Sequence, residues 1–104
     1  MSAQTARSYQ VGLTRTADKC QKKLDAPLRL LVRDAIMVIA ESPFTRGERL
    51  SQPFGSIYSH HIKYKGQEFR VAYLIQEEAE NVVILLIGPH ENFYRKLKNL
   101  LDAA

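Results

Sequence analysis

The alternation of apolar and polar residues over Ser56–Tyr73 constrains the fold more than any other pattern in the chain. Apolar and aromatic residues recur at every second position on both sides of Gly66-Gln67, which indicates a β-hairpin with a type II′ turn. In that register Lys63 lies opposite Arg70. Since side chains alternate between the faces of a strand, we expect one face to pack in the core. That face comprises Tyr58, His60, Ile62, Tyr64, Phe69, Val71, Tyr73 and Ile75.

The other face of this hairpin carries the charged side chains. Lys63 would lie directly across from Arg70, with His61 beside them. Like charges that face each other destabilise a sheet, so this pairing indicates an anion bound between the two cations. Arginine is a permanently charged planar fork that fits a phosphate, and a lysine beside a second cation is favoured as a general base. The alternative is that both side chains cover a solvent face and point apart.

Basic residues cluster around the hairpin. The net charge of the whole chain is only +4, from fifteen Lys and Arg against eleven Asp and Glu. A local basic patch of this kind predicts a nucleic acid or an acidic protein as partner. The patch spans 25 residues and comprises Arg46, Arg49, Lys63, Lys65 and Arg70.

The length of 104 residues suits one domain with a single core, and residues 1–7 are polar and expected to fray. The longest apolar run, Val82–Ile87, is too short to span a bilayer, so no membrane association is expected. We expect no signal peptide, because the first residues lack an apolar stretch. The lone Cys20 suits a reducing cytoplasm. No Cys/His cluster has zinc spacing, so no metal and no cofactor are predicted.

The remaining patterns predict an α+β domain in the order β-α-α-β-β-β-α. A mainly antiparallel sheet would carry a helical hairpin on one face and leave the other face partly open. Thr16 is the expected N-cap of the first helix. The loop at residues 42–56 is expected to be exposed and basic. The other elements are a strand at 8–14, an amphipathic helix at 27–41, an acidic turn at 77–81, a strand at 82–87 and a helix at 92–101.

Two residues near the last strand could take part in chemistry. His90 follows the strand in a short loop, which is a common location for catalytic groups, and histidine transfers protons near neutral pH. Tyr94 lies one helical turn later and should stay off the core stripe of its helix. The alternative is that His90 caps the helix and Tyr94 covers its edge. His60 is expected on the core face, where a hydrogen bond would satisfy it.

Four segments of the chain, in this order and spacing, resemble the RelE/ParE superfamily of toxins from type II toxin–antitoxin systems. The resemblance covers nearly the whole chain, and its RelE-like branch implies a small α+β toxin domain. The segments are residues 50–55 (LSQPFG), 58–64 (YSHHIKY), 68–73 (EFRVAY) and 88–95 (GPHENFYR).

The resemblance also implies a site. The RelE-like pattern has basic residues on the second strand, an arginine on the third, an arginine or histidine after the last strand, and a tyrosine near the C-terminus. These positions fall on His61 and Lys63, on Arg70, on His90 and on Tyr94. RelE has lysine in place of His61 and arginine in place of His90, so the assignment of acid and base stays open.

RelE-like members cut mRNA in the ribosomal A site. The resemblance therefore implies a metal-independent endoribonuclease in which the 2′-hydroxyl attacks the adjacent phosphate. Lys63, Arg70, His90 and Tyr94 are the predicted catalytic residues, and His61, Lys65, Arg46 and Arg49 are predicted to bind RNA. The implied partners are an acidic antitoxin, mRNA and the ribosome. The alternatives are a ParE-like inhibitor of DNA gyrase and an inactive homologue that only binds an antitoxin.

Overall fold

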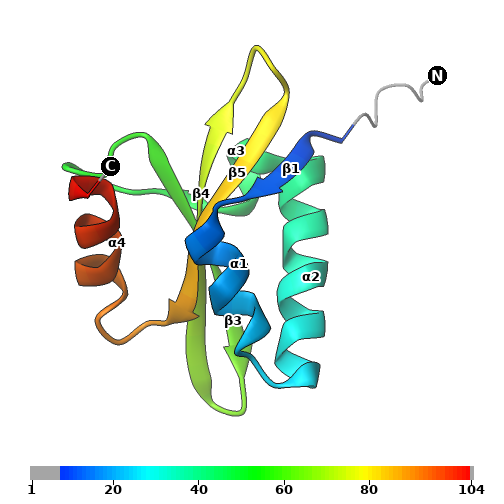
Figure 1. Cartoon of the computed structure of the whole chain (residues 1–104). Coiled ribbons are helices and arrows are strands. Elements are labelled where there is room, and N and C mark those ends of the chain that lie inside the picture. Colours follow the sequence, from blue (N-terminus) through cyan, green and yellow to red (C-terminus); the bar gives the residue numbers. More distant parts are fainter. Residues whose placement is uncertain (1–7, 104) are drawn as a thin grey trace.

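A computed structural model describes residues 8–103, and the segment expected to fray, residues 1–7, lies outside this range. The α+β class is confirmed, with two short elements added to the expected order (Figure 1). In chain order the elements are β1 (Gln10–Leu13), α1 (Arg15–Lys22), α2 (Ala26–Glu41), α3 (Pro43–Arg46), β2 (Glu48–Arg49), β3 (Ile57–Tyr64), β4 (Gln67–Gln76), β5 (Asn81–Pro89) and α4 (Phe93–Asp102).

The sheet has five strands in the order β1-β5-β4-β3-β2. The last three strands along the chain form the expected antiparallel meander, with β4 between β3 and β5. β1 pairs with β5 in parallel, and the two-residue β2 pairs only with Ser59 and Tyr58 of β3. The rest of β3 therefore forms an edge of the sheet. No helix within residues 8–103 is long and apolar enough to cross a membrane.

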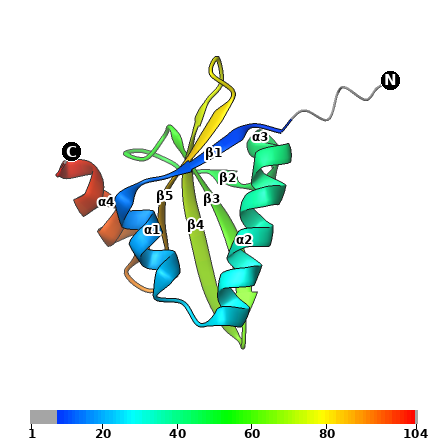
Figure 2. The same cartoon turned by 45° about the vertical axis from the view of Figure 1, so that its right-hand side comes forward.

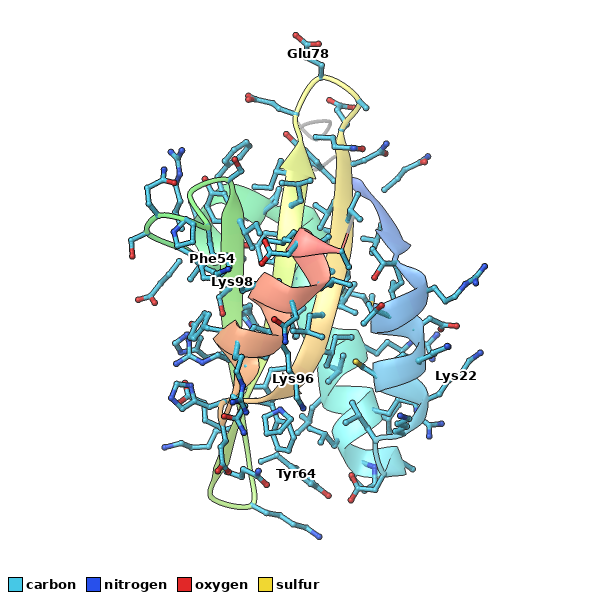
Figure 3. The ribbon with its side chains drawn as sticks, turned by 60° about the vertical axis from the view of Figure 1, so that its left-hand side comes forward. Lys22, Phe54, Tyr64, Glu78, Lys96 and Lys98 are labelled. Carbon is cyan, nitrogen blue, oxygen red and sulfur yellow. The ribbon has the colours of Figure 1, made fainter. Side chains whose placement is uncertain are left out.

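Helices cover the two faces of the sheet unequally. α1 and α2 form the expected helical hairpin and lie together on one face, while α4 lies on the other (Figures 1 and 2). Figure 3 shows α4 in front of β4 and β5, with the β3–β4 turn near Tyr64 extending beyond it. One face is thus covered by two helices, and the other is covered only where α4 packs.

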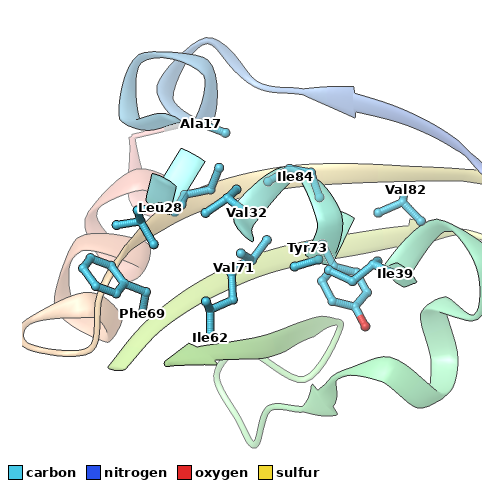
Figure 4. Packing of buried hydrophobic residues seen from close by; sticks show 12 residues of the cluster. Ala17, Leu28, Val32, Ile39, Ile62, Phe69, Val71, Tyr73, Val82 and Ile84 are labelled. Atoms are coloured by element: carbon cyan, nitrogen blue, oxygen red, sulfur yellow. The ribbon is translucent and has the colours of Figure 1, made fainter. Parts of the chain in front are cut away.

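The main core lies between the helical hairpin and the sheet (Figure 4). Leu28, Val32 and Ile39 of α2 pack there against Val71 and Tyr73 of β4. The apolar and aromatic residues of the predicted core face of the hairpin join this cluster, whereas His60 lies outside it. Their role is packing, as the alternation of the sequence predicted.

The buried hydroxyl of Tyr73 has one partner, the carbonyl oxygen of Pro43, to which it donates a hydrogen bond of 2.6 Å. Burial raises the pKa of Tyr73 from 10.0 to about 12, because the charged phenolate would lose its hydration. This bond anchors α3 to the sheet. Gly47, directly after α3, is packed so tightly that an added Cβ would lie 2.5 Å from the same hydroxyl oxygen.

The predicted N-cap of α1 was wrong by two residues. Thr14, not Thr16, caps the helix: its Oγ1 accepts a hydrogen bond of 3.1 Å from the backbone N–H of Ala17. The same hydroxyl donates to the carbonyl oxygen of Leu85, also over 3.1 Å. Thr14 therefore links the start of α1 to β5, a long-range contact that sequence spacing does not reveal.

The predicted register of the β3–β4 hairpin was also wrong. The two-residue turn is Lys65-Gly66, with φ of 52° and 77°, the positive values that a type I′ turn requires and a type II′ turn does not. Tyr64 consequently pairs with Gln67, and Arg70 lies opposite His61 instead of Lys63. Each strand keeps its inward and outward faces, because the partner of every residue moves by two positions.

The segment at residues 42–56, expected to be a loop, is partly ordered. It contains the single turn of α3 and the short strand β2, and a loop follows at residues 50–56. Phe54 from this loop packs against Tyr94 of α4, with ring centroids 6.2 Å apart. The loop thereby contacts the face of the sheet that carries α4.

A bulge in β5 lets neighbouring parts of this strand contribute apolar side chains to the clusters on both faces of the sheet. Ala72 pairs with Leu86 and the next residue, Tyr73, pairs with Ile84, so Leu85 is an extra residue on β5. Ile84 packs with the main core, whereas Leu86 packs with Phe93 and Leu97 of α4 in a second cluster. This second cluster fixes the start of α4 above β4.

Candidate functional site

Arg70 is the centre of a polar cluster on the α4 side of the sheet. Its side chain comes from the middle of β4 and is only 11% exposed. Its Nε donates to Nδ1 of His90 over 2.8 Å, and its Nη1 lies 2.7 Å from Nε2 of His61 and 2.5 Å from the hydroxyl of Tyr94. Side chains from β3, from the residue after β5 and from α4 therefore meet around the guanidinium of Arg70, which comes from β4.

His61 is held between Arg70 and a carboxylate. It lies directly opposite Arg70 on β3, and its Nδ1 lies 2.9 Å from Oε2 of Glu68. Glu68 lies two residues before Arg70 on β4, so both side chains project from the same face of the strand. The same Oε2 is 3.5 Å from Nη2 of Arg70. Glu68, His61 and Arg70 thus form a connected triangle.

His90 is positioned by the end of β5. Its backbone N–H donates to the carbonyl oxygen of Glu68 over 2.9 Å, which continues the pairing of β4 with β5 by one residue. Its carbonyl oxygen accepts from the N–H of Phe93, the first residue of α4. Asn92, at φ of 62°, is the N-cap residue of that helix. The expectation that His90 only caps the helix therefore does not describe its side chain, which contacts Arg70.

Tyr94 covers the guanidinium from the α4 side. Its ring centroid is 5.2 Å from Cζ of Arg70, within the range of a cation–π contact. The same ring is also in edge-to-face contact with the ring of His90, with ring centroids 6.4 Å apart. Phe93 and Leu97 are buried beneath α4, while Tyr94 is only partly buried and packs against the same cluster.

The hydrogen bonds to Arg70 indicate which nitrogen of each histidine ring acts as the acceptor. A guanidinium can only donate, so Nε2 of His61 and Nδ1 of His90 must each present a lone pair to Arg70. This geometry corresponds to the tautomer with the proton on Nδ1 of His61, next to Glu68, and on Nε2 of His90.

Arg70 keeps one side of its guanidinium available. The three hydrogens on Nε and Nη1 are used by His61, His90 and Tyr94. Within residues 8–103, the only contact of Nη2 is the 3.5 Å approach of Glu68. The two N–H groups at Nη2 are thus the part of the guanidinium best placed to bind an oxyanion.

Lys63 and Lys65 lie outside this cluster. Lys63 pairs with Glu68, is exposed, and makes no hydrogen bond or ion pair within the described part of the chain. The predicted opposition of Lys63 and Arg70 is therefore wrong, although both residues share the outward face. Lys65 lies in the turn, with its Nζ 5.3 Å from the centroid of the Tyr64 ring. Four residues of extended strand put it about 13 Å along β3 from His61.

Arg46 and Arg49 belong to the neighbouring edge of the sheet. Arg46 lines a polar hollow of about 290 Å³ together with Glu48, Ser59, His60 and His61. The hydroxyl of Ser59 is buried there and has no hydrogen-bond partner among residues 8–103. Arg49 is turned away, and its Nε donates to the carbonyl oxygen of Gly55 over 2.6 Å.

His60 takes the structural role that was expected. It is partly buried, and its Nδ1 forms a 2.6 Å hydrogen bond with the carbonyl oxygen of Arg46. This bond holds the end of α3 against β3. His60 and His61 thus have separate roles on opposite faces of the same strand.

Glu68 was not predicted as a site residue from the sequence, where the basic residues around it carried the prediction. Its spacing of two from Arg70 was the available signal, since that spacing puts both side chains on one face of a strand. The contact of Glu68 with His61 depends on the register of the hairpin and could not be read in the predicted register.

Comparisons with known proteins place these residues in a family context. The family model described as a ParE-like toxin of type II bacterial toxin–antitoxin systems matches residues 11–98. No match was found among curated proteins.

Solved structures of toxins from such systems are similar to this chain. The toxin–antitoxin complex RelBE2 from Mycobacterium tuberculosis matches with a TM-score of 0.69 and 25% identity, over 80% of this chain and 92% of the other. Free E. coli toxin RelE, solved as a mutant, matches with a TM-score of 0.67 and 22% identity, over 89% and 98%. The YoeB/ParE toxin from Agrobacterium tumefaciens has a TM-score of 0.66 and 15% identity, over 78% and 98%.

Proposed function

The chain belongs to the ParE-like toxins of type II bacterial toxin–antitoxin systems, and we propose that it is a metal-independent endoribonuclease that cleaves mRNA at the ribosome. The observation that carries this proposal is the set of contacts that Arg70 makes with His61, His90 and Tyr94. It combines a fixed positive charge with two groups able to transfer protons. Cleavage of a phosphodiester needs both of these functions.

The reaction is a transesterification. The 2′-hydroxyl of RNA attacks the adjacent phosphorus, the bond from phosphorus to the 5′-oxygen breaks, and the products carry a 2′,3′-cyclic phosphate and a 5′-hydroxyl. One proton leaves the attacking hydroxyl and one reaches the departing oxygen, so a base and an acid suffice. DNA lacks the 2′-hydroxyl, which restricts the substrate to RNA.

Arg70 would bind the scissile phosphate through the free side of its guanidinium and stabilise the charge that develops on it. His90, whose Nε2–H is not used by Arg70, is the candidate for transferring a proton at the leaving oxygen. Tyr94 would orient the nucleotide or stack on a base. Lys63 would add positive charge from the same outward face, and it competes for the role of base.

The flanking basic residues would bind the RNA backbone beyond the scissile bond. Arg46 opens onto the hollow beside His61, and Lys65 lies along the exposed edge of the hairpin. Arg49, which is bound to Gly55, would need to release that contact to reach a phosphate. Substitution of these three residues should weaken binding more than it slows the chemical step.

The rival candidate is a toxin that inhibits DNA gyrase without cleaving RNA. The ParE-like description of the family favours this alternative. Purified protein separates the two in parallel assays of translation and of gyrase supercoiling. Loss of translation with cut mRNA and unchanged supercoiling supports the nuclease, and the opposite pair of results supports the gyrase inhibitor. A protein inactive in both assays would be a homologue that only binds its antitoxin.

An antitoxin is the proposed protein partner, because the chain belongs to the toxins of toxin–antitoxin systems. Several similar structures are complexes with RelB-type antitoxins. The sheet face that is only partly covered by α4 is one docking area for such a partner. A groove of about 610 Å³ between α1 and α2 is a second surface. Leu30 and Met37 expose 59% of their surface beside Arg29 and Arg33. An acidic segment with one apolar face would complement this groove.

A further inference from the structure

We infer that Glu68 is a positioning residue that makes His61, and not Lys63, the base for the 2′-hydroxyl; this inference rests on the proposed nuclease function. The observation is the Oε2–Nδ1 distance of 2.9 Å between Glu68 and His61, in a cluster where Nε2 of the same ring faces Arg70 at 2.7 Å. The carboxylate and the guanidinium thus contact opposite nitrogens of one imidazole.

This double contact fixes both the tautomer and the orientation of His61. The carboxylate accepts only from a protonated Nδ1, and Arg70 donates only to an unprotonated Nε2. The lone pair of Nε2 is therefore directed toward the guanidinium where the phosphate would bind. A hydroxyl next to that phosphate would meet an imidazole nitrogen that is ready to accept a proton.

Proton transfer also explains why a carboxylate is suited to this position. When Nε2 accepts the proton of the 2′-hydroxyl, the ring becomes an imidazolium, and the negative charge of Glu68 stabilises it. The oxygen–phosphorus bond forms as the bond to the 5′-oxygen breaks, and a second group returns a proton to that oxygen. Arg70 would exchange its contact with Nε2 for contacts with the phosphate oxygens.

Other charged groups around His61 fit this role less well. Glu48 of β2 approaches Nε2 only to 3.9 Å, and its side chain is 79% exposed. Lys63 is on the same strand and face but makes no hydrogen bond or ion pair within residues 8–103. No such interaction in this range therefore fixes the orientation of its side chain. His61 has an orienting partner in Glu68, and the lone pair of its Nε2 lies in the site, where it accepts from Arg70.

The first test measures single-turnover cleavage of a short mRNA on purified ribosomes. His61→Ala should lower the rate by about 100-fold or more, the usual loss for a general base, and Glu68→Gln should lower it by about 10-fold. The double variant His61→Ala/Glu68→Gln should be no slower than His61→Ala, since Glu68 acts through His61. The matched control is Glu78→Gln, in the distant β4–β5 turn (Figure 3), which should cleave at the wild-type rate.

The second test reads the tautomer of His61 directly by long-range ¹H–¹⁵N NMR of the free protein. The wild type should show the Nδ1–H form, and Glu68→Ala should lose it, whereas a purely structural role would leave the tautomer unchanged. An Nε2–H form in the wild type, or additive rate losses in the double variant, would overturn the inference while the nuclease function stands. A wild-type protein that leaves mRNA intact would remove the nuclease function and the base role together.

Discussion

Nε of Arg70 donates a 2.8 Å hydrogen bond to Nδ1 of His90, which links the middle of β4 to the residue that follows β5. His90 is in turn held by the backbone bond from its N–H to the carbonyl oxygen of Glu68. The guanidinium therefore has a fixed orientation before any ligand binds. Preorganised charge of this kind is the most effective contribution a protein makes to stabilising a developing negative charge.

Replacement of Arg70 should abolish activity and preserve the fold. Arg70→Ala is expected to reduce mRNA cleavage by about 100-fold or more and to relieve growth arrest, because the charge at the phosphate is lost. Arg70→Lys should restore little, since a single ammonium cannot reproduce the planar fork. Circular dichroism checks the fold, and Arg15→Ala on exposed α1 is the matched control. Growth arrest of wild-type strength by a folded Arg70→Ala protein would contradict this role.

The secondary structure could largely be predicted from periodicity. The apolar repeat of α2 and the alternation of β3 and β4 are strong local signals. α2 appears within one residue of its predicted bounds, and the hairpin extends three residues beyond its predicted end, to Gln76. α3 and β2 were missed because each is too short to have a period. The N-cap at Thr14 was missed because its hydroxyl also bonds to β5, a contact made only in the folded chain.

The site could be predicted in part, for a physical reason. The alternation of side chains along each strand decides which of them point outward, whatever the register. His61 and Arg70 were therefore correctly predicted on one face with Lys63. Their pairing depends on the turn, and the left-handed conformation of Lys65 was not anticipated, since a residue with a Cβ rarely adopts it. One changed turn replaced Lys63 by His61 as the partner of Arg70.

The β3–β4 turn offers a test of the observed register. Lys65 adopts a positive φ of 52°, which costs a residue with a Cβ about 1–2 kcal/mol, and asparagine tolerates it better. Lys65→Asn should therefore raise the free energy of unfolding by up to about 1 kcal/mol, and Gly66→Ala should lower it by about as much. Urea unfolding measures both. Destabilisation by Lys65→Asn would indicate that the turn lies elsewhere.

Tyr73 should make stability depend on alkaline pH. Below pH 10, Tyr73→Phe should lower the free energy of unfolding by about 1–3 kcal/mol, because the buried carbonyl oxygen of Pro43 loses its hydrogen-bond donor. The pKa of Tyr73 is raised in the folded protein, so its contribution is complete below the ordinary value of 10.0 and is lost as the pH rises toward about 12. The stability difference between wild type and variant should therefore narrow over this range.

A control for Tyr73 is available in the same chain. Tyr9→Phe removes a hydroxyl that makes no hydrogen bond to any residue in 8–103, so its stability difference from wild type should be small. Urea unfolding at a series of pH values from 8 to about 12 compares the variants. A constant difference for Tyr73→Phe would contradict the assigned burial of the neutral phenol.

The groove between α1 and α2 can be tested separately from catalysis. Met37→Glu introduces a charge that repels an acidic antitoxin and should weaken its binding by about 10-fold or more, with mRNA cleavage unchanged. Leu31→Glu is the matched control: this exposed apolar residue is also on α2 but does not line the groove. Calorimetric titration with the antitoxin gives both affinities. Equal weakening by both variants would show that the groove is not the docking surface.

The central claim is that this toxin cuts RNA with the cluster around Arg70, and mapping RNA 5′ ends in cells tests it most directly. After induction without antitoxin, the wild type should generate new 5′-hydroxyl ends inside translated codons, and the Arg70→Ala protein at equal abundance should generate none. Growth arrest by the wild type with no new 5′ ends, together with loss of gyrase supercoiling, would contradict the nuclease account.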